Sequence, residues 1–217
     1  MKNSSINILK DLIIRYPELE QNYNNILDSI NIIADCYKNG GKVLVCGNGG
    51  SAADSEHIVG ELMKGFLLPR KLEVKDQEKI KEIFPEDAEY LIDNLQQALP
   101  TISLVSQTAL QTAFANDNAP DLSFAQQVLG YGNKNDVLIS ISTSGNSKNV
   151  LYASQIAKCK EMKVVSLTGS KGGILKDLSN VLINVPSDET FIIQEYHLPV
   201  YHAICACLEN EFFGYEE

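Results

Sequence analysis

Short apolar runs alternate with helical patterns from residue 42 onward, and this alternation limits the chain to few folds. The runs are 42–46 (KVLVC), 101–106 (TISLVS), 136–142 (DVLISIS), 163–169 (KVVSLTG) and 181–186 (VLINVP). Continuous apolar strands that are each followed by a helix are typical of a parallel sheet buried on both faces. Five of them predict an α/β fold with a doubly wound, five-stranded parallel sheet, whose ligands bind at the carboxyl ends of the strands.

Residues 1–40 precede the alternation and predict N-terminal helices. Apolar residues recur there at alternating spacings of four and three, and the pattern stops at Gly40-Gly41. The stripe consists of Leu19, Tyr23, Ile26, Ile30, Ile33 and Tyr37. Such a stripe packs on its own domain or forms a bundle between subunits. We favour oligomerisation helices at 1–40 and an α/β domain at 41–217, because the stripe lies outside the alternation.

Residues 66–100 interrupt the alternation with a charge-rich insertion. Its Pro85-Glu86-Asp87 step is typical of a helix start, so the segment predicts two short helices. A solvated excursion is our first interpretation, and a lid over a binding site is the alternative.

Composition excludes several classes of protein. A net charge of −10 argues against general affinity for nucleic acid or an anionic membrane. The N-terminus is too polar for a secretory signal, and no apolar stretch reaches spanning length. The five cysteines include no CxxC pair and lie in apolar segments, as expected of buried, reduced thiols. We therefore expect a cytoplasmic protein.

A glycine-rich loop follows the first strand. Gly47-Asn48-Gly49-Gly50-Ser51 permits a sharp turn that points several N–H groups one way. A helix is expected to begin there with Ser51 as its N-cap. Free N–H groups and the helix dipole favour an anion at that end, most often a phosphate.

A second loop, Ser142 to Ser147, follows the third strand and also leads into a helix. Its clustered hydroxyls can donate several hydrogen bonds to one phosphate without a lysine or arginine, which suits an acidic protein. Two such loops at the carboxyl ends of one sheet predict a phosphate site. Gly47, Gly49 and Ala52 also fit the dinucleotide pattern G-x-G-x-x-A, but no second strand ending in an acidic residue follows at the required distance.

Polar residues on two helices suggest chemistry beside the phosphate. His57 and Glu61 are four residues apart and share one helix face. The apolar C-terminal helix carries His197 and His202, and buried imidazoles are either satisfied core groups or part of a site. Gln194 lies eight residues before His202, about 12 Å along a straight helix. A shared ligand would require a kink at Pro199, an irregular start of the helix, or different subunits.

These motifs together resemble one family, the sugar isomerase (SIS) domain proteins, and in particular its phosphoheptose isomerase branch. The resemblance rests on 41–61 (GKVLVCGNGGSAADSEH and Glu61), 115–118 (ANDN), 136–150 (DVLISISTSGNSKNV), 167–173 (LTGSKGG) and 193–202 (IQEYHLPVYH). It implies a flavodoxin-like SIS fold, a homotetramer formed through N-terminal helices, and one zinc ion per subunit. The 66–100 insertion, Gly60 and Pro199 depart from the family pattern.

The resemblance also implies the roles of individual residues. Glu61 would be the base that moves a proton between C1 and C2 of a phosphosugar, and His202 the acid/base on the sugar oxygens. Zinc would be held by His57, Glu61, Gln194 and His202. The substrate would contact Asn48, Gly49, Gly50, Ser51, Glu61, Asn116, Asp117, Ser142, Thr143, Ser144, Ser147 and Gln194.

The resemblance implies an aldose–ketose isomerase acting on sedoheptulose 7-phosphate in heptose synthesis for a surface glycan. The alternatives are a SIS protein without catalysis that associates with a replication initiator, and a sugar-phosphate sensor. Glu61 and His202 together favour the enzyme, because neither alternative needs both residues.

Overall fold

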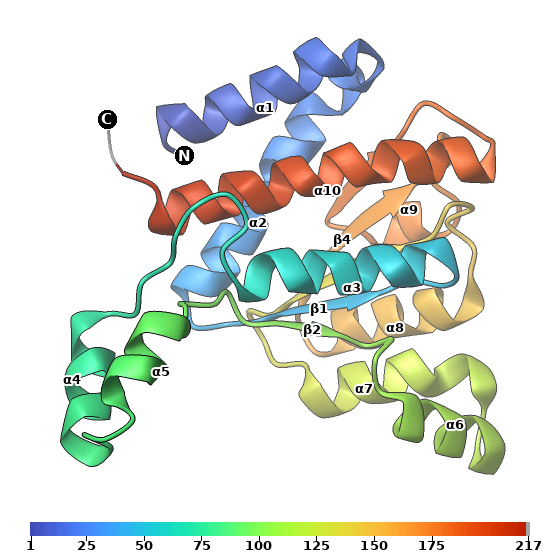
Figure 1. Cartoon of the computed structure of the whole chain (residues 1–217). Coiled ribbons are helices and arrows are strands. Elements are labelled where there is room, and N and C mark those ends of the chain that lie inside the picture. The colour runs from blue at the N-terminus through green and yellow to red at the C-terminus, as the bar shows by residue number, and fades with distance from the viewer. Residues whose placement is uncertain (216–217) are drawn as a thin grey trace.

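The computed structural model describes residues 1–215 and shows one parallel sheet of five strands (Figure 1). The strands are β1 (Val43–Cys46), β2 (Thr101–Ser103), β3 (Val137–Ile141), β4 (Lys163–Thr168) and β5 (Val181–Asn184). Their spatial order is β2-β1-β3-β4-β5, and every neighbouring pair is parallel. The chain therefore winds in opposite directions from β1, and this confirms the predicted doubly wound fold.

Alternate residues of the central strands β1, β3 and β4 enter two separate cores, one on each face of the sheet. Val43 and Val45 of β1 pack with α1 (Asn3–Arg15), α2 (Tyr23–Lys38), α3 (Gly50–Met63) and α10 (Thr190–Phe213). Leu44 and Cys46 pack on the other face, whose helices are α7 (Ser123–Tyr131), α8 (Lys148–Cys159) and the short α9 (Leu175–Leu178). The strands are continuously apolar because both of their faces are buried.

The N-terminal stripe is buried within its own chain. Leu19, in the 3-10 turn Pro17–Asn22, is inaccessible to solvent, as are Ile26, Ile30 and Ile33 of α2. Helix α1 lies along α10, so residues 1–40 complete the core on one face of the sheet (Figure 1). The interpretation of this stripe as a seam between subunits is therefore not supported. Association of the chain through other surfaces of these helices stays a prediction.

The insertion contains the two predicted helices, α4 (Val74–Ile83) and α5 (Ala88–Asn94). They pack on each other and project away from the sheet, and α4 has no buried residue (Figure 1). Beyond it, α6 (Thr108–Asp117) and the turn Pro120–Leu122 lead into α7. Within this chain the insertion matches a solvated excursion better than a lid.

Helix α10 is the longest element and runs unbroken through Pro199. Gln194 therefore lies inside the helix, which removes an irregular start as the way to bring it toward His202. Within residues 1–215, no helix combines the length and hydropathy needed to cross a bilayer. Four cysteines are buried as expected, but Cys159 is exposed because it lies at the solvent-facing end of α8.

Candidate active site

The glycine-rich loop joins β1 to α3 at the carboxyl end of the sheet. Helix α3 begins at Gly50, and Gly49 occupies the N-cap position with φ of +57°. The prediction of Ser51 as N-cap is therefore wrong, because Gly49 adopts the left-handed conformation that the turn requires. Ser51 lies buried in the first turn, 3% exposed. The helix dipole nevertheless points its positive end at the loop, as an anion site requires.

Gln194 of α10 lies directly against this loop. A Cβ atom built on Gly50 would lie 2.6 Å from Gln194 Nε2, well inside van der Waals contact. Any side chain at position 50 would therefore displace the amide. The predicted substrate residues Gly50 and Gln194 are brought together, although they are far apart in sequence.

The second loop meets the first at the switch point between β1 and β3. Ser142 and Ser147 share a hydrogen bond of 3.0 Å between their hydroxyls. Asn48 and Asn149 exchange two amide hydrogen bonds of 2.9 Å, which tie the start of α8 to the glycine-rich loop. Thr143 accepts a hydrogen bond from the Gly169 N–H through its carbonyl. The two predicted phosphate loops therefore form one polar surface.

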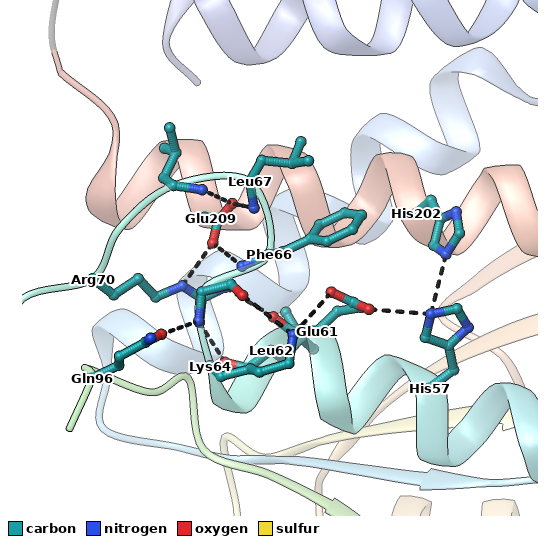
Figure 2. A network of polar contacts seen from close by, with 12 residues as sticks. His57, Glu61, Leu62, Lys64, Phe66, Leu67, Arg70, Gln96, His202 and Glu209 are labelled. Carbon is teal, nitrogen blue, oxygen red and sulfur yellow. Dashed lines mark hydrogen bonds and ion pairs between the residues drawn. The ribbon is translucent and has the colours of Figure 1, made fainter. Parts of the chain in front are cut away.

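His57, Glu61 and His202 form a connected group about two turns along α3 from the glycine-rich loop, with His57 in the middle (Figure 2). His57 Nε2 lies 3.1 Å from Glu61 Oε1 and 3.5 Å from His202 Nε2. The other oxygen, Glu61 Oε2, is buried and has no hydrogen-bond partner in the described part of the chain. Its nearest cation, Lys64 Nζ, is 3.8 Å away. Burial and the neighbouring charge of His57 lower the pKa of His202.

Sequence reasoning missed the residues that orient His57. Tyr201 Oη lies 3.0 Å from His57 Nδ1 and donates a hydrogen bond of 3.3 Å to Asp54 Oδ1. Because the Tyr201 hydroxyl donates its hydrogen to Asp54, its oxygen accepts a hydrogen bond from His57 Nδ1–H. His57 Nε2 is then unprotonated and presents a lone pair toward Glu61 and His202. Burial raises the pKa values of both Tyr201 and Asp54. Asp54 lies three residues before His57 on the same helix, and this spacing is a signal in the sequence that could have identified Asp54 as a neighbour of His57.

The donor atoms around His57 suit a zinc ion in part. In a tetrahedral zinc site, two ligand atoms that each lie about 2.0–2.1 Å from the metal are about 3.3 Å from each other. The distances from His57 Nε2 to Glu61 Oε1 and to His202 Nε2, 3.1 Å and 3.5 Å, are close to this value. A lone pair on that nitrogen needs a proton or cation between it and its two neighbours. Across residues 1–215, however, no three His, Cys, Asp or Glu side chains already surround one point. Gln194 packs on Gly50 and makes no hydrogen bond to these three residues in the described structure.

Asn116 and Asp117 are not brought into the group. They lie at the end of α6, where the Asn116 amide donates a hydrogen bond of 2.9 Å to Asp117. No hydrogen bond joins either residue to the other predicted site residues in the part of the chain that the structure describes. A cavity of about 510 Å³ opens beside His202, between α1 and the segment containing Phe66 and Leu67. Of the predicted site residues, only His202 lines this cavity.

Comparison with known proteins shows the family of the chain. The family model of the SIS domain matches residues 12–75 and 81–169. A phosphoheptose isomerase of Helicobacter pylori is 41% identical over 194 residues, which cover 89% of this chain and 88% of that protein. A solved phosphoheptose isomerase of Francisella tularensis superposes with a TM-score of 0.72 at 32% identity, covering 95% of this chain and 93% of that one. One of Neisseria gonorrhoeae gives 0.70 at 33%, covering 93% and 94%.

With its doubly wound sheet and paired loops, the chain belongs to the SIS domain family. Within that family it belongs to the phosphoheptose isomerase branch, and it is an isomerase. The prediction of an enzyme is therefore confirmed over the two non-catalytic alternatives.

Proposed function

We propose that this isomerase interconverts sedoheptulose 7-phosphate and D-glycero-D-manno-heptose 7-phosphate through an enediol or enediolate. The carboxylate of Glu61 carries the proposal, because Oε1 faces His57 Nε2 at 3.1 Å while buried Oε2 has no hydrogen-bond partner in the described residues and keeps its lone pairs free for a proton from carbon. The names of the relatives support a seven-carbon phosphosugar over other lengths. Its product would supply the heptose of a surface glycan.

The two loops would hold the phosphate. The start of α3 and the hydroxyls of Ser142 and Ser147 offer N–H and O–H donors without a formal positive charge. A chain of net charge −10 therefore relies on local dipoles to retain a dianion. His57 lies seven residues after Gly50, about 10 Å along α3, so an extended sugar would reach from the loops to His57, whose Nε2 lies 3.1 Å from Glu61 Oε1.

Proton transfer would use Glu61 and His202. Glu61 removes a proton from C1 of the ketose while protonated His202 gives a proton to the C2 oxygen, which yields the enediol. Glu61 then returns its proton to C2, and the proton on the C1 oxygen passes to His202. C1 becomes the aldehyde carbon, and both side chains recover their starting states. The lowered pKa of His202 makes its protonated form a stronger acid.

We also propose that His57, Glu61 and His202 hold a zinc ion, with Gln194 as the fourth ligand implied by the family resemblance. When bound, zinc would take the place of the His202 proton, polarise the sugar carbonyl and stabilise negative charge on the enediolate oxygens. Glu61 would use Oε1 in this contact and keep Oε2 for the carbon-bound proton. Gln is an uncommon zinc ligand, and its position against Gly50 makes it the weakest of the four.

The first test is an NMR time course of the protein with sedoheptulose 7-phosphate in D2O, with and without added zinc. We expect a new aldose signal that carries deuterium at C2, because the proton held by Glu61 exchanges with the solvent before it is returned, and faster turnover with zinc. Reaction of fructose 6-phosphate in place of the heptulose would overturn the heptose assignment. If no ketose phosphate reacts, the proposed reaction is wrong.

A Glu61→Gln variant tests the base. Turnover should disappear while substrate binding, measured by calorimetry, stays near that of the wild type, because the amide keeps the shape but cannot take the proton. Glu56→Gln is the matched control, since Glu56 lies on the exposed side of the same helix and accepts from Ser106. Activity of the Glu61 variant within about tenfold of the wild type would contradict the assignment.

A further inference from the structure

A fully buried ion pair, Arg70 with Glu209, lies next to the group formed by His57, Glu61 and His202. Arg70 Nε donates to Glu209 Oε1 at 2.8 Å, and neither side chain is accessible to solvent. Arg70 follows α3, which carries Glu61, and Glu209 lies on α10, seven residues after His202. The pair therefore joins the two helices that supply the proposed base and acid (Figure 2).

The carboxylate of Glu209 also shapes the segment between α3 and Arg70. It accepts three successive backbone N–H groups, from Phe66 at 2.7 Å, Leu67 at 2.6 Å and Leu68 at 3.0 Å. Such a row of N–H groups forms a concave anion site, here occupied by a side chain of the same protein. The segment is thereby held against α10, with the Phe66 ring 5.6 Å from that of His202.

The guanidinium of Arg70 closes the end of α3. It donates to the Leu62 carbonyl at 2.6 Å through Nη1 and to the Glu61 carbonyl at 2.9 Å through Nη2. The last carbonyls of a helix have no partner within it, so this contact fixes the turn that carries Glu61. The planar fork is needed, because a lysine ammonium lacks the geometry to bind both carbonyls and the carboxylate together.

A buried ion pair is a poor source of stability, because apolar residues of similar volume often stabilise a core as well or better. The fixed geometry of the pair can instead hold neighbouring groups in place. We propose that Arg70 and Glu209 are positioning residues, which hold Glu61 and His202 at their working distance from His57. This inference rests on the proposed catalytic roles of Glu61 and His202.

Arg70→Lys and Glu209→Gln test the positioning role, with Asp136→Asn as the matched control. Asp136 is another buried carboxylate, 2% exposed, which binds Lys42 Nζ at 2.6 Å and two backbone N–H groups. It precedes β3 and makes no hydrogen bond to His57, Glu61, His202, Arg70 or Glu209 within the described residues. All three variants should lose stability to urea. Only the first two should lose kcat, by about 10- to 100-fold per folded molecule, with KM within about threefold of the wild type.

A second measurement does not depend on turnover. The chain has three histidines, so the imidazole NMR signals of 15N-histidine-labelled protein are few enough to assign. Arg70→Lys should shift the signals of His57 and His202 and leave those of His197, whereas Asp136→Asn should shift none of them. Unchanged ring signals, or full kcat in both site variants, would overturn the positioning role. A wild type inactive on every phosphosugar would instead refute the proposed function, and the ring signals would still decide this inference.

Discussion

His197 is the one histidine that faces the core instead of the site. It is fully buried, and Nε2 donates to the Thr168 carbonyl at 3.3 Å, while Nδ1 has no partner within residues 1–215. Burial lowers the pKa of His197 from 6.5 to about 4. The unfolded chain therefore binds a proton at a higher pH than the folded chain does. This residue's contribution to stability is complete above the unfolded pKa and is lost as pH falls toward 4.

We expect the free energy of unfolding to fall between pH 6.5 and about 4, with His197 accounting for about 3 kcal/mol of the decrease. Urea unfolding at several pH values measures the decrease. His197→Gln, which keeps a donor for Thr168 but cannot titrate, isolates the contribution of the imidazole from that of the carboxylates. Equal pH slopes for the wild type and this variant would show that His197 does not control the acid limb.

The sequence predicts those residues of the site that lie close together along the chain. Gly49, His57 and Glu61 lie in one loop and helix, so motif and spacing suffice to group them. Arg70 and Glu209 escaped prediction because their partners are 139 positions apart. A carboxylate near the end of an apolar helix is expected to face solvent until the partner that buries it is known. Tyr201 escaped for a similar reason, since a tyrosine in an apolar helix resembles a core residue.

At the scale of elements, every predicted strand is present, because continuous apolar runs between turn signals are typical of buried strands. The two insertion helices were also predictable from their charge pattern and the proline start. Their position was not predictable, because an amphipathic pattern does not identify the surface that a helix contacts. The same limit explains the N-terminal stripe, whose spacing fits packing within one chain as well as between chains.

Excision of the α4–α5 hairpin tests whether it serves only as an excursion. The two ends of the segment already meet, since Gln97 N–H donates to the Arg70 carbonyl at 2.9 Å and its side chain donates to Lys71 at 2.6 Å. Replacing residues 73–94 with a short Gly-Ser linker should therefore leave the urea midpoint nearly unchanged, because α4 buries no residue and α5 buries only the small side chain of Ala88. We expect kcat to remain at the wild-type value. A rise in KM alone would instead assign the hairpin to substrate capture, as the lid alternative requires.

At the scale of the whole molecule, the main remaining prediction concerns the assembly of several copies of the chain into a homotetramer. The apolar stripe of α2 is used within the chain, but α1 still presents Ile14 to solvent, 77% exposed. Beside it lies an apolar cavity of about 550 Å³, lined by Lys10, Ile13, Ile14, Glu20 and Tyr23. An exposed aliphatic side chain next to such a surface suits contact with another copy of the chain. The surface of α1 therefore replaces the stripe of α2 as the expected contact.

We expect native mass spectrometry to show a species of four times the 23.9 kDa chain. Ile14→Glu should dissociate it, because a carboxylate placed in an apolar contact loses its hydration without gaining a partner. Ile83→Glu, at a 53% exposed position of α4, is the control and should leave the assembly intact. A monomeric wild type would refute the tetramer, whereas a tetramer that survives Ile14→Glu would place its contact elsewhere. Since α1 also borders the cavity beside His202, dissociation should lower activity together with mass.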